Sequence, residues 1–225
     1  MKKFELTSKF ITNIFGTKLF RIKALVEFGN VKAGELGGYI EKEENLSQYG
    51  NAWVCDDARV YGDAWVCGNA WVCDDAEVCG NAWVYGDARV YGNARVCGDA
   101  RVYGNARVCD DAEVCGNAWV YGDAWVYGDA WVCGNAWVYG DAWVCGNAWV
   151  YGDDDFATVH VFGSEHRTTT FFRLKDGNIG VRCGCFYGNL SEFRKKVVET
   201  HGETKKAKEY LMIADLMEFR FSDNS

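Results

Sequence analysis

The sequence contains no proline and no uninterrupted apolar run near the 18 or more residues that span a bilayer as a helix. We therefore expect that the protein is not embedded in a membrane, although 49% of its residues are hydrophobic and can form a core. The polar residues Thr7, Ser8 and Lys9 interrupt any apolar stretch after the initial Met-Lys-Lys, so no cleavable secretion signal is predicted. These two absences predict a cytoplasmic location.

Lysine is missing from residues 51–153, which contain five Arg, thirteen Asp and two Glu and so carry a net charge of −10. A surface that binds a nucleic-acid duplex needs clustered Lys or Arg to displace counterions from the phosphates. Direct nucleic-acid binding by this segment is therefore disfavoured.

The eleven cysteines do not have the spacing of a small secreted disulfide framework, because nine of them occupy equivalent places in a repeat. We expect reduced thiols. Side chains that point the same way on stacked strands are poorly directed toward one another for a disulfide. A column of stacked cysteines is therefore interpreted as a small filler of corners rather than as a metal site or a redox wire; it comprises Cys79, Cys97, Cys115 and Cys133.

The most informative feature is a repeat of six residues, Ala-x-Val-[Tyr/Cys]-[Gly/Asp]-[Asn/Asp], which runs over residues 52–150 seventeen times without insertion. The Ala-x-Val triplet alternates inward and outward as a short strand does. The Gly-Asn or Gly-Asp pair next to it supplies the positive-φ turn that ends the strand. Each hexad is therefore one strand and one corner.

This pattern resembles the hexapeptide-repeat family of left-handed parallel β-helices, in which a small residue follows an aliphatic one by four positions, as Ala58 follows Val54 here. The resemblance implies a mainly β fold with three hexads, or about 18 residues, in each triangular coil. Coils then stack at about 4.8 Å. One departure is Tyr or Cys directly after the valine, where the family often has Gly.

Residues between Ala and Val point outward, and taking every eighteenth one predicts three faces. The first face comprises Trp53, Trp71, Arg89, Arg107, Trp125 and Trp143; the second Arg59, Glu77, Arg95, Glu113, Trp131 and Trp149; the third Trp65, Trp83, Arg101, Trp119 and Trp137. A corner column comprises Tyr85, Tyr103, Tyr121 and Tyr139. An interior of Ala and Val is too narrow for a ligand, so function is expected outside. Two interpretations of the ten Trp and four Tyr remain open: rings that shield one another, or a partner-binding surface.

Two non-repeat segments flank the predicted solenoid of residues 49–153. Residues 1–48 are expected to be an N-terminal cap, with strand-like pieces at residues 18–28 and a glycine-rich turn at residues 34–38. Residues 31–40, VKAGELGGYI, resemble a leader that precedes such repeats in uncharacterised bacterial and prophage proteins. This resemblance implies a phage or prophage origin and hence a bacterial host cell.

Residues 154–225 are predicted to form a small α+β domain. Strands are expected at residues 157–162, 168–174 and 179–186, with a hairpin turn at residues 175–178. Ser191 is predicted to cap a helix that runs to about residue 200, and Thr204 a second helix with one apolar face. The segment Cys-Gly-Cys-Phe-Tyr-Gly at residues 183–188 resembles the C-terminus of phage-encoded proteins.

Enzymes that resemble this coil in fold are acyltransferases, which use a histidine base on the solenoid, and carbonic anhydrases, which use three solenoid histidines as metal ligands. This solenoid contains no histidine, because His160, His166 and His201 all lie in the C-terminal segment. Neither mechanism can be carried over to these residues, and fold alone supplies no site. We expect no enzyme activity.

Two sets of residues offer weak metal sites. Cys183 and Cys185 with a histidine could bind zinc, but they lack a second cysteine pair and are interpreted as core or interface thiols. A column of Asp56, Asp74 and Asp110 could bind Ca²⁺, but aspartate also tolerates a turn conformation and is interpreted as solvated. No metal or cofactor is predicted.

The sequence thus favours a non-enzymatic binding protein of phage or prophage origin that captures a host protein or protein complex, for example as an inhibitor of a host defence system. Mimicry of DNA by the acidic rod is a version of this hypothesis. A second hypothesis is a structural protein that assembles into dimers, trimers or fibres. A third is a solenoid that binds a sugar or another small ligand by stacking on Trp.

Overall fold

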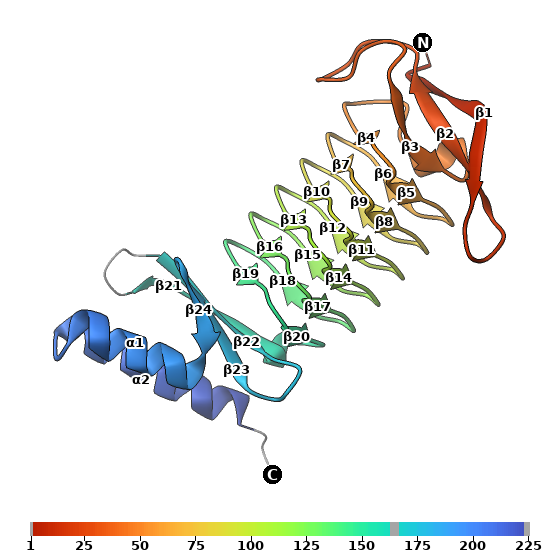
Figure 1. The fold of residues 1–225 in the computed structure, drawn as a ribbon. Coiled ribbons are helices and arrows are strands. Elements are labelled where there is room, and N and C mark those ends of the chain that lie inside the picture. Colours follow the sequence, from red (N-terminus) through yellow and green to blue (C-terminus); the bar gives the residue numbers. More distant parts are fainter. Residues whose placement is uncertain (1, 163–166, 223–225) are drawn as a thin grey trace.

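The computed structural model describes residues 2–162 and 167–222. Along the described chain, an N-terminal cap, a β-solenoid and a C-terminal sheet with two helices follow one another, and the cap and the sheet lie at opposite ends of the solenoid (Figure 1). Neither of the two described α-helices is long and apolar enough to cross a membrane. His166 lies outside the described residues.

The solenoid consists of two-residue strands, each made of an outward residue and the valine that follows it. Strands 18 residues apart pair in parallel, as Trp53 does with Trp71. They form three sheets, ordered β4-β7-β10-β13-β16-β19, β5-β8-β11-β14-β17-β20 and β6-β9-β12-β15-β18. The strands are β4 (Trp53–Val54), β5 (Arg59–Val60), β6 (Trp65–Val66), β7 (Trp71–Val72), β8 (Glu77–Val78), β9 (Trp83–Val84), β10 (Arg89–Val90), β11 (Arg95–Val96), β12 (Arg101–Val102), β13 (Arg107–Val108), β14 (Glu113–Val114), β15 (Trp119–Val120), β16 (Trp125–Val126), β17 (Trp131–Val132), β18 (Trp137–Val138), β19 (Trp143–Val144) and β20 (Trp149–Val150). The parallel β-solenoid expected from the repeat is confirmed.

The solenoid core is made of the repeated Ala and Val side chains, each of which is at most 2% exposed. Burying two small apolar side chains in every hexad stabilises the coil through a uniform series of contacts. Corners use positive φ angles, which glycine adopts without steric cost, as at Gly80 with φ 70°. Asp56, Asp74 and Asp110 occupy this conformation too, with φ between 53° and 60°. The turn role expected of these aspartates is confirmed.

The N-terminal cap adds three strands to one solenoid sheet. Strand β2 (Lys18–Ala24) pairs antiparallel with both β1 (Phe4–Thr12) and β3 (Leu36–Ile40), and β3 pairs in parallel with β5. A short helix, η1 (Glu43–Asn45), follows. The sequence did not predict β1, because residues 7–9 were interpreted only as an interruption of an apolar stretch.

The C-terminal unit packs on the other end of the solenoid. After a short helix, η2 (Asp153–Asp155), the antiparallel strands β21 (Phe156–Phe162), β22 (Arg167–Arg173), β23 (Ile179–Cys183) and β24 (Phe186–Asn189) form a sheet. Helices α1 (Leu190–His201) and α2 (Lys205–Phe221) pack on each other and on this sheet (Figure 1). The backbone N–H of Lys175 donates to the carbonyl of Asn147, which joins the unit to the last coil.

Two predictions for this unit are wrong. The single strand expected at residues 179–186 is divided into β23 and β24, because Gly184 has a positive φ of 57° and turns the chain. Asn189, not Ser191, caps α1: its side chain accepts from Glu192 N while the Glu192 carboxylate accepts from Asn189 N. The predicted cap at Thr204 is confirmed by its bond from Ala207 N at 3.3 Å.

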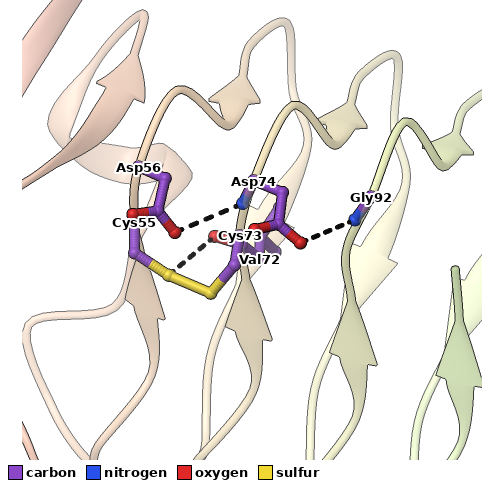
Figure 2. Close-up of a disulfide and its surroundings, with 6 residues drawn as sticks. All are labelled: Cys55, Asp56, Val72, Cys73, Asp74 and Gly92. Carbon is purple, nitrogen blue, oxygen red and sulfur yellow. Dashed lines mark hydrogen bonds between the residues drawn. A yellow bond between two sulfur atoms is a disulfide. The ribbon is translucent and has the colours of Figure 1, made fainter. Parts of the chain in front are cut away.

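The prediction that all thiols are reduced is also wrong. Cys55 is joined to Cys73, and Cys115 to Cys133. Figure 2 shows the first pair, whose sulfurs face each other across neighbouring coils. Stacked residues of one column have Cα atoms 4.7 and 4.6 Å apart in these pairs, which lies within the range that a disulfide bridges. Coil stacking therefore brings the sulfurs together despite parallel Cβ directions.

Candidate functional site

The predicted binding residues differ widely in exposure. Trp65, Trp83, Trp131 and Trp137 are 36–45% exposed, and Tyr139 is 47% exposed. Five other tryptophans are half-buried: Trp71, Trp119, Trp125, Trp143 and Trp149. The outward positions therefore include both shielded rings and rings open to a partner.

Trp53 is a correction to the predicted surface. Its side chain is fully buried, because Phe28 of the N-terminal cap lies edge-on against it at 5.4 Å between ring centroids. Gly37 of the cap also lies directly beside the indole. Trp53 is thus an anchor for the cap and is not available to a partner.

The sheet β6-β9-β12-β15-β18 carries a continuous surface of rings, which we call the aromatic face. It comprises Trp65, Trp83, Arg101, Trp119 and Trp137 together with Tyr85, Tyr103, Tyr121 and Tyr139. Trp119 stacks on Trp137 at 5.2 Å with planes only 7° apart. The Arg101 guanidinium lies between two indoles, 5.3 Å from Trp83 and 4.8 Å from Trp119, in cation–π geometry.

The four tyrosines of the aromatic face form a stacked ladder along the solenoid. Ring centroids are 4.8 Å apart for Tyr85 and Tyr103, 4.9 Å for Tyr103 and Tyr121, and 5.5 Å for Tyr121 and Tyr139. Partial burial raises the pKa of Tyr85, Tyr103 and Tyr121. These hydroxyls therefore stay protonated and can donate hydrogen bonds well above neutral pH.

The aromatic face ends in a hollow of about 550 Å³ between the last coils and the C-terminal unit, which we call the junction hollow. Tyr121, Trp137 and Tyr139 enter it from the solenoid, and Met217 and Arg220 enter it from α2. The Arg220 guanidinium lies 3.8 Å from a carboxylate oxygen of Asp154 at the rim. The junction hollow thus combines flat apolar walls with one cation and nearby carboxylates.

The second face, β5-β8-β11-β14-β17-β20, is charged at one end and aromatic at the other. Arg95 Nε lies 3.9 Å from a carboxylate oxygen of Glu77. Trp131 and Trp149 meet edge to face at 6.2 Å, beside a hollow of about 540 Å³ that Lys175 also lines. The Lys175 ammonium lies 5.9 Å from the Trp149 ring centre, which partly covers this indole.

The first face, β4-β7-β10-β13-β16-β19, is the most covered. Arg89 and Arg107 are direct neighbours in its ladder, and Arg107 stacks over Trp125 at 4.8 Å. Trp143 at its end lies under the Arg182 guanidinium of β23 at 5.0 Å. This face therefore offers less open aromatic surface than the aromatic face.

The aspartates proposed as weak calcium ligands bind the backbone of the next coil. Gly92 N donates to Asp74 at 2.9 Å and Asp74 N to Asp56 at 3.4 Å (Figure 2). Gly128 N donates to Asp110 at 3.2 Å in the same way. These contacts give each carboxylate a role in coil stacking. Figure 2 places two of the three beside the Cys55–Cys73 disulfide.

The cysteines proposed as weak zinc ligands line a hollow of about 260 Å³ together with His201. Thr169 Oγ1 donates to Cys183 Sγ at 3.2 Å. Among the described residues, two groups of three possible ligands have their ligand atoms within 4.8 Å of one another: Cys55 with Asp56 and Cys73, and Cys97 with Glu113 and Cys115. Neither group includes Cys183 or Cys185.

Sequence reasoning missed ladders of asparagine and aspartate at the corners. Asn69 Nδ2 donates to Asp87 at 3.0 Å, and Asn105 Nδ2 to Asp123 at 2.8 Å. Asparagine followed by aspartate or asparagine 18 residues later is the sequence signal that could have identified these bonds.

A comparison with known families agrees with this architecture. Residues 52–68, 82–98, 88–102, 94–110 and 100–116 match a family described as the YdcK beta solenoid repeat. Together with the strand pairing, this match defines the chain as a repeat β-solenoid protein. No curated protein matches the chain.

Proposed function

We propose that the chain is a non-enzymatic binding protein that captures a protein partner on its aromatic face and in the junction hollow. The observation that carries the proposal is the contrast between a closed Ala and Val core and an open surface of stacked rings. Exposed aromatic surface of this extent on a rigid scaffold is typical of an interaction site.

The composition of the aromatic face supports a protein partner. Tryptophan, tyrosine and arginine are the residue types that contribute most binding energy in protein interfaces. Stacking already restricts the rings, so little side-chain entropy is lost on binding. The acidic solenoid adds long-range attraction for a basic partner.

The finer assignment is a left-handed solenoid with three hexads in each coil, from a phage or prophage. Pairing of residues 18 apart in three sheets supports the coil, and the resemblance of residues 31–40 to prophage leaders supports the origin. The partner would then be a protein or complex in the cytoplasm of the bacterial host, and inhibition of a defence system is the specific version to test. If the partner normally binds DNA, the acidic solenoid would occupy the surface of the partner on which the DNA duplex otherwise lies.

Affinity capture from bacterial lysate tests the proposal with the full chain as bait. Trp137→Ala removes a ring shared by the aromatic face and the junction hollow, and Trp131→Ala is the matched control, with similar exposure on another face. We expect Trp137→Ala to lower capture about tenfold or more, and Trp131→Ala to leave it unchanged. Equal capture by both variants, or no partner above background, contradicts the proposal. Light scattering of the purified chain identifies a second copy of the chain as the partner instead.

A second candidate function rests on the hollow beside Trp131 and Trp149. Asp129, Asn147 and Lys175 line it as well, and indole faces with carboxylate and amide groups suit a sugar ring. Isothermal titration with oligosaccharides tests it. Binding that Trp131→Ala abolishes and Trp137→Ala leaves intact supports it, and heat changes equal to those of dilution exclude it.

A further inference from the structure

Four successive coils carry a cysteine at the same corner, directly after the valines of β8, β11, β14 and β17. We call this set the cysteine column; it comprises Cys79, Cys97, Cys115 and Cys133. Tyr61 and Tyr151 occupy the same corner on the coils before and after it. The cysteine column is therefore a closed set of four sulfurs that can react with one another.

One disulfide occupies one end of the cysteine column, and two thiols occupy the other end. Cys115 is joined to Cys133, with Cα atoms 4.6 Å apart. Cys97 Sγ lies within 4.8 Å of Cys115 Sγ and 3.8 Å from a carboxylate oxygen of Glu113. Cys79 lies on the coil before that of Cys97, and its backbone N–H donates to the carbonyl of Val96 at 2.9 Å. Cys115 lies on the coil next to that of Cys97, so it is the sulfur of the Cys115–Cys133 disulfide that a Cys97 thiolate can reach.

We propose that the cysteine column is a thiol–disulfide exchange site, along which a single disulfide migrates from coil to coil. In the first step the Cys97 thiolate attacks the Cys115 sulfur. The Cys97–Cys115 bond forms, the Cys115–Cys133 bond breaks, and Cys133 leaves with the electron pair as a thiolate. In the second step the Cys79 thiolate attacks Cys97, and Cys115 leaves. The number of disulfides is constant, so no oxidant is consumed.

Before the first step, the negative charge of the two free thiols rests on Cys79 rather than on Cys97. The hydrogen bond from Cys97 is the main cause that lowers the pKa of Cys79 to about 7, and Tyr61 and Arg95 lower it further while burial and Glu77 oppose them. The pKa of Cys97 is raised, first by this shared proton and then by burial, with Glu113 acting in the same direction. The pair therefore holds one proton near neutral pH. Movement of that proton from Cys97 to Cys79 creates the attacking thiolate on Cys97.

The other disulfide provides an internal contrast. Cys55 and Cys73 are followed in their column by Tyr91, so no thiol on the next coil can attack them. Cys67 is likewise followed by Tyr85 on the next coil. Migration is therefore expected in the cysteine column alone.

Peptide mapping of the whole chain distinguishes the three positions of the disulfide. Trypsin separates three peptides: residues 60–89, which contain Cys67, Cys73 and Cys79; residues 96–101, which contain Cys97 alone; and residues 108–167, which contain Cys109, Cys115, Cys133 and Cys145. The chain is reduced, oxidised with a limiting amount of diamide, freed of oxidant, quenched with acid and blocked with N-ethylmaleimide in denaturant. Tandem mass spectrometry then assigns the cysteines in each linked peptide.

We expect residues 96–101 to be linked both to residues 60–89 through Cys79 and to residues 108–167 through Cys115. All three possible pairs join residues of one column on neighbouring coils, so each link should be recovered as a measurable fraction of the molecules. Recovery of residues 96–101 only in the blocked, unlinked form overturns the proposal.

Movement is separated from static mixing by slow alkylation of the folded chain without reductant. Alkylation cannot change the links of a static mixture, because it only blocks the thiols that are already free in each molecule. In a migrating mixture it removes the attacking thiols one by one, so the proportions of the three links should shift while alkylation proceeds, and constant proportions overturn migration. Cys97→Ser should abolish every link to Cys79, whereas the matched control Cys67→Ser should change neither the links nor their shift.

Discussion

The Lys3 ammonium donates a hydrogen bond of 2.9 Å to the carbonyl oxygen of Ala52 at the N-terminal end of the solenoid. Backbone N–H groups along the solenoid donate to carbonyls of the next coil, as Trp53 N does to Ala70 O at 3.0 Å. Without the flanking units, the first coil would have unpaired carbonyls and the last coil would have unpaired N–H groups. Lys3 supplies one of the missing donors.

Replacement of Lys3 should destabilise the chain. Lys3→Met keeps the apolar stem but leaves the Ala52 carbonyl buried without its donor, so the free energy of unfolding should fall by about 1–3 kcal/mol. Lys2→Met is the control, because Lys2 pairs with Glu43 on the exposed surface and should change stability by less than about 1 kcal/mol. Urea unfolding measures both, and equal effects would contradict a capping role.

Stability should also depend on pH through Lys3. Burial lowers the pKa of Lys3 from 10.5 to about 8 in the folded chain. Between about pH 8 and 10.5 the unfolded chain binds the additional proton, so stability rises with pH in this window. The difference in unfolding free energy between the wild type and Lys3→Met should therefore be constant below pH 8 and increase above it, since the other titrating groups cancel. A difference that is flat or falls across the window would exclude this linkage.

At the C-terminal end, Thr170 should be needed as an acceptor. Its hydroxyl is buried and accepts a 3.0 Å hydrogen bond from Trp143 N, which has no further coil to donate to. Thr170→Val should lower the unfolding free energy by about 1–3 kcal/mol. Thr170→Ser keeps the hydroxyl oxygen and should recover most of this loss. Thermal melts measure both variants. A serine variant that is as unstable as the valine variant would argue against the hydrogen bond.

Substitutions at Gly80 and Gly140 distinguish the cost of an unfavourable backbone conformation from the cost of a steric clash with the next coil. A Cβ at Gly80 would lie 2.9 Å from the backbone of Gly98 on the next coil, whereas a Cβ at Gly140 would meet nothing within 4 Å. Both positions have positive φ, so Gly140→Ala should cost about 1–2 kcal/mol for conformation alone. Gly80→Ala should cost about 1–3 kcal/mol more. Similar melting temperatures for the two variants would refute tight stacking at Gly80.

The sequence predicted the solenoid and its faces because each hexad repeats the same local chemistry. The pairing of Arg95 with Glu77, for example, follows from counting 18 residues. The tyrosine ladder follows from the same count, and its rings indeed stack. Because the repeat length is constant, a local pattern predicts which residues contact each other on neighbouring coils. A sequence without repeats does not allow such a prediction.

What escaped prediction depends on contacts outside the repeat or on fine geometry. Trp53 is buried because Phe28 folds onto it from a loop without periodicity. The disulfides depend on sulfur positions that a Cβ direction does not determine. The helix cap at Asn189, by contrast, could have been predicted, because Glu192 three residues later completes the sequence signal of a capping box.

The two ends of the solenoid are chemically opposite, since Lys3 provides a donor at the first coil and Thr170 an acceptor at the last. Every coil between them presents the same hydrogen-bonding edge to its neighbours. Insertion or deletion of 18 residues would leave the hydrogen bonds of both end units matched to the solenoid. It would change the distance between these units by one coil, a spacing of 4.7 Å between the Cα atoms of Cys55 and Cys73. The length of the solenoid can therefore change in fixed steps without a change in the sequence of either end unit.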